Sequence, residues 1–288
     1  MVPQSVFIFA WIASIMFGLE AISGKLTSRH AIKNPWLLNF FWLLFILVLT
    51  VPVALWGGAR LPTHWTNIIF ASFFYALGSA LYVLALYKVD VSVIAPLYSF
   101  RTVVAVILGT IILGEILTTK QYLLIAIIVI FGIFTSIDER FHVKSFFNRG
   151  IVIVLCATVT SAIMAVFIKM AVVDTNFWDT TLWMALLGQI WLLPTILLFK
   201  KDLLTATKKQ YLIVLAVAAV GVIGTLASNK AYSINVGIAS AIIALPISMI
   251  IAFLFSSFAP TLLEKHPLKI YAIRFVSAAI MIVAALNL

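Results

Sequence analysis

The amino-acid sequence predicts an all-α membrane protein whose ten transmembrane helices form two inverted five-helix repeats. Three observations support this fold class. Of the 288 residues, 64% are hydrophobic and 10% are charged, whereas a typical soluble domain has about 45–50% apolar and about 25% charged residues. Ten apolar stretches are long enough to cross a bilayer, and the second half of the chain repeats marker residues of the first. The composition excludes a soluble enzyme and a disordered chain.

The predicted membrane spans are continuous apolar stretches. A spanning helix needs about 20 such residues, because each residue rises about 1.5 Å through about 30 Å of hydrocarbon. Strands would show alternating polarity instead, so helices are favoured over a barrel. The ten stretches comprise residues 4–25, 35–56, 66–87, 91–114, 121–137, 149–172, 177–199, 211–232, 236–259 and 268–287. Only short loops remain between them, and we expect neither a soluble domain nor a cleaved signal peptide.

Lys and Arg residues are distributed unequally between the two sides of the predicted bundle. Most of them follow the first, third, fifth, seventh or ninth stretch, as Lys33, Lys144 and Lys209 do. The positive-inside rule places these loops in the cytoplasm and both termini outside. We therefore expect a multi-pass protein of the cell (inner) membrane with extracytoplasmic termini. The net charge of +10 reflects this asymmetry, so we expect no nucleic-acid partner.

Marker residues recur in the two halves of the chain at offsets of 142 to 149 positions. The matched pairs are Lys25 and Lys169, Pro52 and Pro194, Tyr87 and Tyr232, and Glu115 and Glu264. They predict two units, 1–145 and 146–288. Because each unit holds five spans, an odd number, the second is inserted upside down relative to the first. Such halves exchange conformations during alternating access, although duplication is also compatible with a purely structural bundle.

The region from Lys88 to Phe134 holds the clearest motif. Its segment Gly114-Glu115-x-Leu117-Thr118, at the turn between the fourth and fifth spans, resembles the motif of the EamA-like transporters of the drug/metabolite transporter superfamily. The resemblance extends over nearly the whole chain as two five-helix units. In the second half Glu264 is kept, whereas Leu263 and Pro267 replace the Gly and the Thr.

The resemblance implies secondary transport, usually export, of a small molecule through a central cavity. It also implies that helices one, three, four, six, eight and nine line that cavity. Members of the superfamily carry amino acids, sugars, nucleotide derivatives, amines and other metabolites. The resemblance therefore does not define the substrate.

Ionisable residues inside the predicted spans are candidates for substrate binding, because a charge near the bilayer centre costs several kcal/mol. Arg101 lies about 15 Å deep in its span, and Tyr98 lies three residues earlier on the same face. Arg101 cannot lose its proton, so it needs an anionic partner from the protein or from the cargo. Glu20 shares a face of the first span with Phe17. Its carboxyl group could accept a proton, bind an ammonium group, pair with Arg101, or reach the membrane surface.

Lys230 and its neighbour Asn229 are further candidates, in the eighth span. Ala85 occupies the position equivalent to Lys230 in the first half, and a charge in one repeat only favours cargo recognition over a scaffold role. The alternative is a lysine whose ammonium group reaches the outer surface. Tyr82 and Trp183 lie inside their spans and could line a pocket or face lipid.

Pro96 and Pro246 interrupt the fourth and ninth spans, which are equivalent helices of the two halves. Proline frees a backbone carbonyl and kinks a helix, and broken helices in corresponding positions mark the binding site in many transporters. We therefore expect gating or hinge roles for both prolines. Glu115 and Glu264 sit at turns, where we expect a helix-terminus or packing role.

The sequence offers no catalytic or metal-binding motif. The four His residues are isolated from one another, the single Cys156 lies in an apolar run, and neither a nucleophile elbow nor an acidic cluster is present. We therefore expect no cofactor, no metal and no enzymatic activity.

Together these features favour a secondary transporter of a small zwitterion, with amino acids or related amines as the preferred cargo. Arg101 and Lys230 would bind a carboxylate and Glu20 an ammonium group. The alternatives are an organic anion, an organic cation held by Glu20 and aromatic residues, or a membrane protein without transport activity. Glu20 makes the proton a candidate coupling ion. In the lipid bilayer the duplicated chain could act as a monomer or as a homodimer.

Overall fold

The structure, a computed structural model, contains only helices and loops in the residues it describes, which are 3–89, 91–135, 149–258 and 268–288. The helices of the first half are α1 (Gln4–His30), α2 (Pro35–Trp56), α3 (Thr66–Lys88), α4 (Val91–Leu97), α5 (Phe100–Leu113) and α6 (Thr119–Thr135). Those of the second half are α7 (Arg149–Asp174), α8 (Phe177–Leu192), the 3-10 helix η2 (Leu193–Leu198), α9 (Lys200–Thr205), α10 (Lys208–Ile234), α11 (Val236–Ile243), α12 (Ile247–Phe258) and α13 (Leu268–Leu286). The predicted all-α class is confirmed for these residues.

Six helical segments of the described residues are long and apolar enough to cross a membrane. They are α1, α2, α3, α7, α10 and the segment Phe177–Leu198, which joins α8 to η2. Four further apolar segments are shorter: Phe100–Leu113, Thr119–Gly132, Val236–Ile251 and Phe275–Leu286. The protein is therefore a multi-pass membrane protein, as its composition predicts. The first span is longer than the predicted 4–25, because Lys25 is buried inside α1 and does not mark its end.

The predicted spans 91–114 and 236–259 are each interrupted and not continuous. In the first span α4 ends one residue after Pro96, and in the second Pro246 directly precedes α12. A proline ring displaces the carbonyl group of the preceding turn and has no N–H to donate, so each helix stops close to its proline. The two breaks occupy corresponding places in the two halves of the chain.

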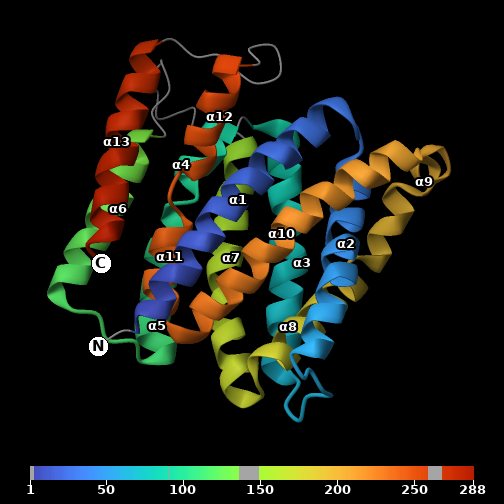
Figure 1. The fold of residues 1–288 in the computed structure, drawn as a ribbon, viewed down its shortest axis with the longest axis horizontal. Helices are drawn as coiled ribbons and strands as arrows, with labels where there is room; N and C mark the ends of the chain where they lie inside the picture. Colours follow the sequence, from blue (N-terminus) through green and yellow to red (C-terminus); the bar gives the residue numbers. More distant parts are fainter. Residues whose placement is uncertain (1–2, 90, 136–148, 259–267) are drawn as a thin grey trace.

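The two halves of the chain are interleaved, because the most extensive helix packing joins one half to the other. α1 packs against α10, α3 against α7, α6 against α13, and α2 against α8. Figure 1 shows α1 and α10 together in the middle of the bundle and α6 beside α13 at its edge. Packing between helices of the same half is less extensive. The core of the described residues is therefore shared between the halves.

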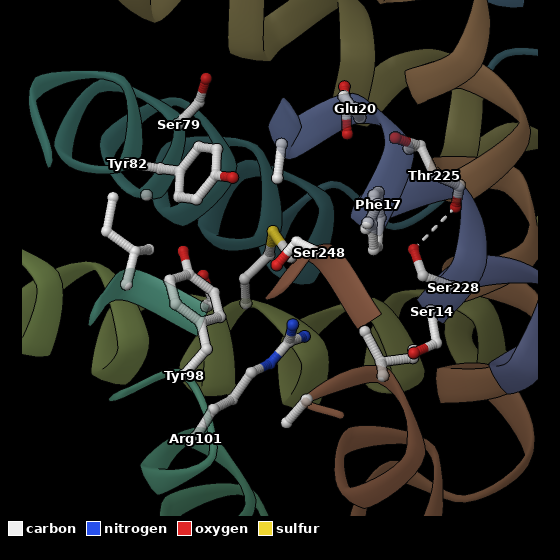
Figure 2. Close-up of a pocket in the computed structure, with 18 of the residues that line it drawn as sticks. Ser14, Phe17, Glu20, Ser79, Tyr82, Tyr98, Arg101, Thr225, Ser228 and Ser248 are labelled. Carbon is white, nitrogen blue, oxygen red and sulfur yellow. Dashed lines mark hydrogen bonds between the residues drawn. The ribbon is translucent and has the colours of Figure 1, made fainter. Parts of the chain in front are cut away.

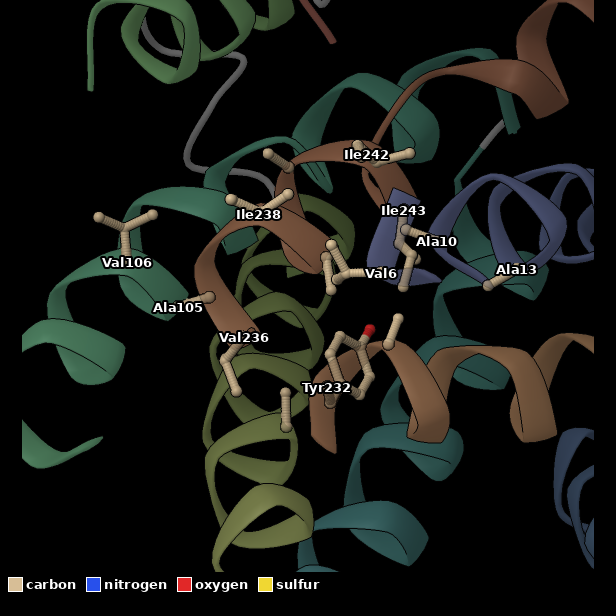
Figure 3. Close-up of a cluster of buried hydrophobic side chains, with 14 of the residues drawn as sticks. Val6, Ala10, Ala13, Ala105, Val106, Tyr232, Val236, Ile238, Ile242 and Ile243 are labelled. Atoms are coloured by element: carbon tan, nitrogen blue, oxygen red, sulfur yellow. The ribbon is translucent and has the colours of Figure 1, made fainter. Parts of the chain in front are cut away.

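The core around α11 is built from small and branched apolar side chains. Every residue of α11 is buried, and Ile238 and Ile242 are fully enclosed. Figure 3 shows Val6 and Ala10 of α1 and Ala105 of α5 around this helix. Small residues let helix backbones approach closely, which supplies the packing that drives helix association where lipid surrounds the protein. The position of α11 therefore depends on both halves.

Glu115 binds the backbone N–H groups at the beginning of α11. Its Oε1 accepts hydrogen bonds from Lys169 Nζ at 2.7 Å and from the Val236 N–H at 2.6 Å, and its Oε2 accepts one from the Gly237 N–H at 3.0 Å. The chain turns back at Gly114, whose φ of +64° is readily adopted by glycine. The carboxylate also matches the positive end of the α11 dipole. Glu115 thus has the helix-terminus role that its place at a turn predicts.

Lys169 and Lys25 make corresponding hydrogen bonds in the two halves. Lys169 Nζ donates to the Ile234 carbonyl oxygen at 3.0 Å, and Lys25 Nζ donates to the Val89 carbonyl oxygen at 2.8 Å. The two lysines are 144 positions apart and the two acceptors 145. The same lysine-to-backbone contact therefore occurs twice. Glu264, the counterpart of Glu115, lies outside the described residues.

We expect Glu115→Gln to destabilise the protein, because the change removes the charge that neutralises Lys169 and leaves one amide oxygen for three donors. Breaking a fully buried ion pair costs about 3–5 kcal/mol. Since the Lys169 side chain is 18% exposed, we expect a loss of about 2 kcal/mol. The apparent melting temperature of the purified protein in detergent should fall by several degrees. Lys120→Gln removes an exposed charge near the same turn and should change nothing; a Glu115→Gln protein as stable as the wild type would contradict this role.

Candidate functional site

A cavity of about 190 Å³ lies between the two halves of the chain. Residues of α1, α2, α3, α4 and α5 form its wall on one side, and residues of α7, α10 and the α11–α12 break form it on the other. The volume is below the roughly 300–1,000 Å³ of pockets for drug-sized ligands, so the cavity suits a small molecule. Figure 2 shows Glu20 at one end of the cavity and Arg101 at the other, with Phe17 and Tyr98 between them.

Six of the residues predicted from the sequence line this cavity. They are Phe17, Glu20, Tyr82, Tyr98, Arg101 and Asn229. They come from α1, α3, α5, α10 and the turn between α4 and α5, so elements distant in sequence bring them together. Pro96 and Pro246 lie at the helix breaks beside the cavity, where Ala95 and Leu245 are lining residues.

Lys230 and Trp183 are not among the described residues that line the cavity. The Lys230 ammonium group lies 4.9 Å from the ring centroid of Phe177. One residue rotates a helix by about 100°, so Lys230 and its neighbour Asn229 face different directions. Trp183 Nε1 donates a hydrogen bond to the Arg60 carbonyl oxygen at 2.8 Å, and its ring meets Trp65 edge-on at 5.0 Å. Both residues make their contacts outside the cavity lining.

The Glu20 end of the cavity is formed by α1, α2 and α10. Trp42 Nε1 donates a hydrogen bond to Glu20 Oε1 at 2.7 Å. The carboxyl group rests on Gly221 of α10, where an added Cβ would stand 2.0 Å from Oε1. Glu20 is buried, and no described Lys, Arg or His forms an ion pair with it. Its partner is therefore a neutral indole.

The Arg101 end is formed by α5 and α10. The Arg101 Nη2 donates a hydrogen bond to Tyr232 Oη, and the guanidinium carbon lies 5.0 Å from the centroid of the same ring. Arg101 is 4% exposed, yet no carboxylate of the described residues pairs with it. The ion pair with Glu20 that the sequence left open is thus not present. The two charges face one cavity from opposite ends.

Aromatic rings and free polar groups line the space between the two charges. Tyr82 and Tyr98 pack edge to face with centroids 5.6 Å apart. Several buried polar atoms of the wall have no hydrogen-bond partner within the described chain: Ser14 Oγ, Tyr75 Oη, Arg101 Nε and Asn229 Nδ2. A buried donor without an acceptor costs about 1–3 kcal/mol. The wall therefore offers hydrogen-bond donors to a polar ligand.

Sequence reasoning missed two residues that contact Glu20 and Arg101 in the cavity. Trp42 belongs to the second span, which was not expected to line the cavity, and no sequence signal marks its contact with Glu20. Tyr232 was used only as a repeat marker. Its position three residues after Asn229 places the two on one helix face, and this spacing could have identified it.

Comparison with known proteins agrees with this architecture. Residues 4–137 match the sequence model of the EamA-like transporter family. The first half of the chain is therefore similar to this family. The resemblance found in the sequence is thereby confirmed for residues 4–137. No curated protein matches the chain. A crystal structure of another protein superposes with a TM-score of 0.71 at 14% identity, covering 98% of this chain and 96% of that one; it shows a shared fold.

We expect Gly221→Ala to destabilise the protein, because the new methyl group displaces the Glu20 carboxyl from Trp42. Overpacking of this kind costs about 1–3 kcal/mol, measurable as a lower melting temperature. Gly78→Ala is a matched control in the same cavity, since its nearest neighbour stands 3.5 Å from the added Cβ. In a Glu20→Ala background the Gly221→Ala penalty should vanish. A penalty that persists undiminished there would show that Gly221 and Glu20 do not share this space.

Proposed function

We propose that the protein is a secondary transporter that moves a small zwitterionic metabolite, such as an amino acid or a related amine, across the cell membrane by alternating access. One observation carries this proposal: a carboxyl group and a guanidinium group face the same cavity from opposite ends, and neither has an ionic partner among the described residues. The match of residues 4–137 to the model of a transporter family favours transport over catalysis.

The proposed inverted repeat, 1–145 and 146–288 with five spans each, is supported by helix packing. If each helix is exchanged for its counterpart, the α1–α10 contact becomes the α7–α3 contact and the α2–α10 contact becomes the α8–α3 contact, and all of these occur. The α2–α8 and α6–α13 contacts correspond to themselves. The matching bonds of Lys25 and Lys169 and the breaks at Pro96 and Pro246 agree with the same relation.

Alternating access is supported by an asymmetry between the halves. Residues of α2 line the cavity, whereas none of the described residues of its counterpart α8 does. In an inverted repeat, exchange of the two conformations would move α8 to the cavity and α2 away from it. We propose that the breaks beside Pro96 and Pro246 serve as the hinges. The lysine-rich loops would face the cytoplasm and both termini the outside.

The cavity supports a zwitterion as cargo because each end complements one of its charges. The Arg101 guanidinium and the unpartnered Asn229 amide are donors for a carboxylate. Glu20, with Trp42 beside it, is an acceptor for an ammonium group, and the neighbouring tyrosine rings favour cations. A cavity of about 190 Å³ fits a molecule of this size. Glu20 is also the group that would bind a coupling proton.

An organic cation is the second candidate cargo. The carboxylate of Glu20, the Trp42 indole and the paired rings of Tyr82 and Tyr98 lie in one cavity, and such an arrangement binds quaternary or primary amines without a carboxylate. In that case Arg101 would hold the helices together through Tyr232 and would not contact the cargo.

We expect counterflow of an amino acid in proteoliposomes that contain the protein. Arg101→Gln should lower kcat/KM for the amino acid about 10- to 100-fold, the weight of one charged hydrogen-bonding group, and leave transport of the matching amine unchanged. Lys230→Gln is the control, since its ammonium group contacts Phe177 outside the cavity. Equal losses for amino acid and amine would assign Arg101 to structure and favour the cation carrier.

We expect Glu20→Gln to abolish concentrative, pH-driven uptake or efflux, because the amide cannot carry a proton through the transport cycle. Counterflow, which needs no net driving force, should persist at a reduced rate. The measurement compares both modes across a pH series, with Ser79→Ala in the same cavity wall as the control. Unchanged pH dependence in Glu20→Gln would remove Glu20 from coupling.

A further inference from the structure

A second hollow lies between the last turns of α1 and the first turns of α10. Its deeper wall is apolar and includes Leu26 of α1 and Ile213, Val217 and Val220 of α10. Its other end, where α1 finishes and α10 begins, is polar and basic. The hollow therefore has the two-part chemistry of a phospholipid, apolar along its length and charged at one end.

The polar end presents the Lys209 ammonium group and further polar side chains. His30 and Lys209 line it and are both exposed, and Gln210 lines it beside them. Gln210 Nε2 donates to the Ala31 carbonyl oxygen at 2.7 Å, so the end of α1 is tied to the start of α10. None of the described residues that line the hollow is acidic. This end is complementary to an anion.

The neighbouring surface supports a position at the boundary between membrane and water. The η2–α9 segment, directly before α10 in the chain, exposes Leu197 by 74% and Leu204 by 88%, and Lys200 and Lys201 are exposed between them. Exposed leucines next to lysines are typical of helices that lie in the headgroup region of anionic membranes. The surface beside the basic end of the hollow therefore has the composition of a segment that faces lipid headgroups.

We propose that this groove between α1 and α10 binds an anionic phospholipid, with its phosphate between His30 and Lys209 and an acyl chain along Ile213, Val217 and Val220. The apolar wall excludes a free phosphate ion as the preferred ligand, because most of the groove would then remain exposed. The α1–α10 seam continues inward to Gly221, on which Glu20 rests. A lipid bound along the seam strengthens the packing that holds the Glu20 end of the cavity.

The test compares two lipids with identical acyl chains, phosphatidylglycerol and phosphatidylcholine, on the purified full-length protein in detergent. Lipid retained per protein is counted by native mass spectrometry, and the melting temperature is followed in parallel, since a ligand of the folded state raises it. We expect phosphatidylglycerol to be retained preferentially. Lys209→Gln should reduce this preference about fivefold, the weight of one lysine near an anionic surface.

Two matched pairs of variants make the result specific to the groove. Lys201→Gln removes an exposed lysine outside the groove, and we expect it to keep the preference. Ala216→Trp fills the groove, whereas Ala219→Trp adds the same side chain to an exposed α10 position that does not line it. Of the two tryptophan variants, only Ala216→Trp should lower the retention of phosphatidylglycerol. If Ala216→Trp does not fold, Lys209→Gln provides the same test.

Three outcomes would overturn the proposal. The first is equal retention of the two lipids by the wild type. The second is an equal loss of preference in Lys201→Gln and Lys209→Gln, which would indicate a general surface charge effect. The third is displacement of phosphatidylglycerol by inorganic phosphate, which would indicate a simple anion site. None of these results depends on transport activity, so the proposal fails or stands separately from the proposed function.

Discussion

The need to neutralise ionisable side chains inside a membrane governs this structure. Glu115 is fully neutralised, because its carboxylate accepts hydrogen bonds from Lys169 and from two backbone N–H groups of α11. Glu20 and Arg101 are not neutralised in this way, because each is buried against an aromatic side chain that carries no opposite charge. Burial of an unpaired charge is costly, and these two residues border the same cavity. This contrast separates the residues that hold the fold from those available to a ligand.

The interleaved packing places the cavity between the two halves of the chain. Its walls come from both halves, and the strongest helix contacts cross between them. A rearrangement of one half against the other would therefore reshape the cavity. Helix α11 would take part, because Glu115 binds its first residues and its last residue lines the cavity. For the proposed movement, the helix breaks near Pro96 and Pro246 would supply backbone that is not bound into a regular helix.

Much of the fold could be predicted from the sequence, and part of the site as well. Apolar run lengths located the helices, since the hydrocarbon thickness fixes how many residues a span needs. The rarity of buried charges singled out Arg101 and Glu20, and the spacing rules of a helix added Tyr98 and Phe17. Lys230 was selected by the same rarity, but its position on the helix turns it away from the cavity, toward Phe177.

Other features depend on packing between distant segments and left no local signal. Trp42 meets Glu20 because α2 packs against α10, on which the Glu20 carboxyl rests, and Tyr232 near the end of α10 meets Arg101 of α5. Gly221 allows the Glu20 carboxyl to lie against α10, which no single-sequence pattern reveals. The interruption of the fourth and ninth spans was expected from their prolines, whereas the interleaving of the halves followed only from the three-dimensional arrangement.

Ligand-induced stabilisation of the purified protein by three matched compounds tests the role of the two unpaired charges most directly. The compounds are an amino acid, the amine that lacks its carboxylate and the acid that lacks its amino group, each applied to the wild type, Glu20→Gln and Arg101→Gln. If the charges bind opposite ends of one cargo, the amino acid raises the melting temperature of the wild type most, and each variant loses the advantage of one end only. Identical responses of all three proteins would show that Glu20 and Arg101 do not contact the ligand.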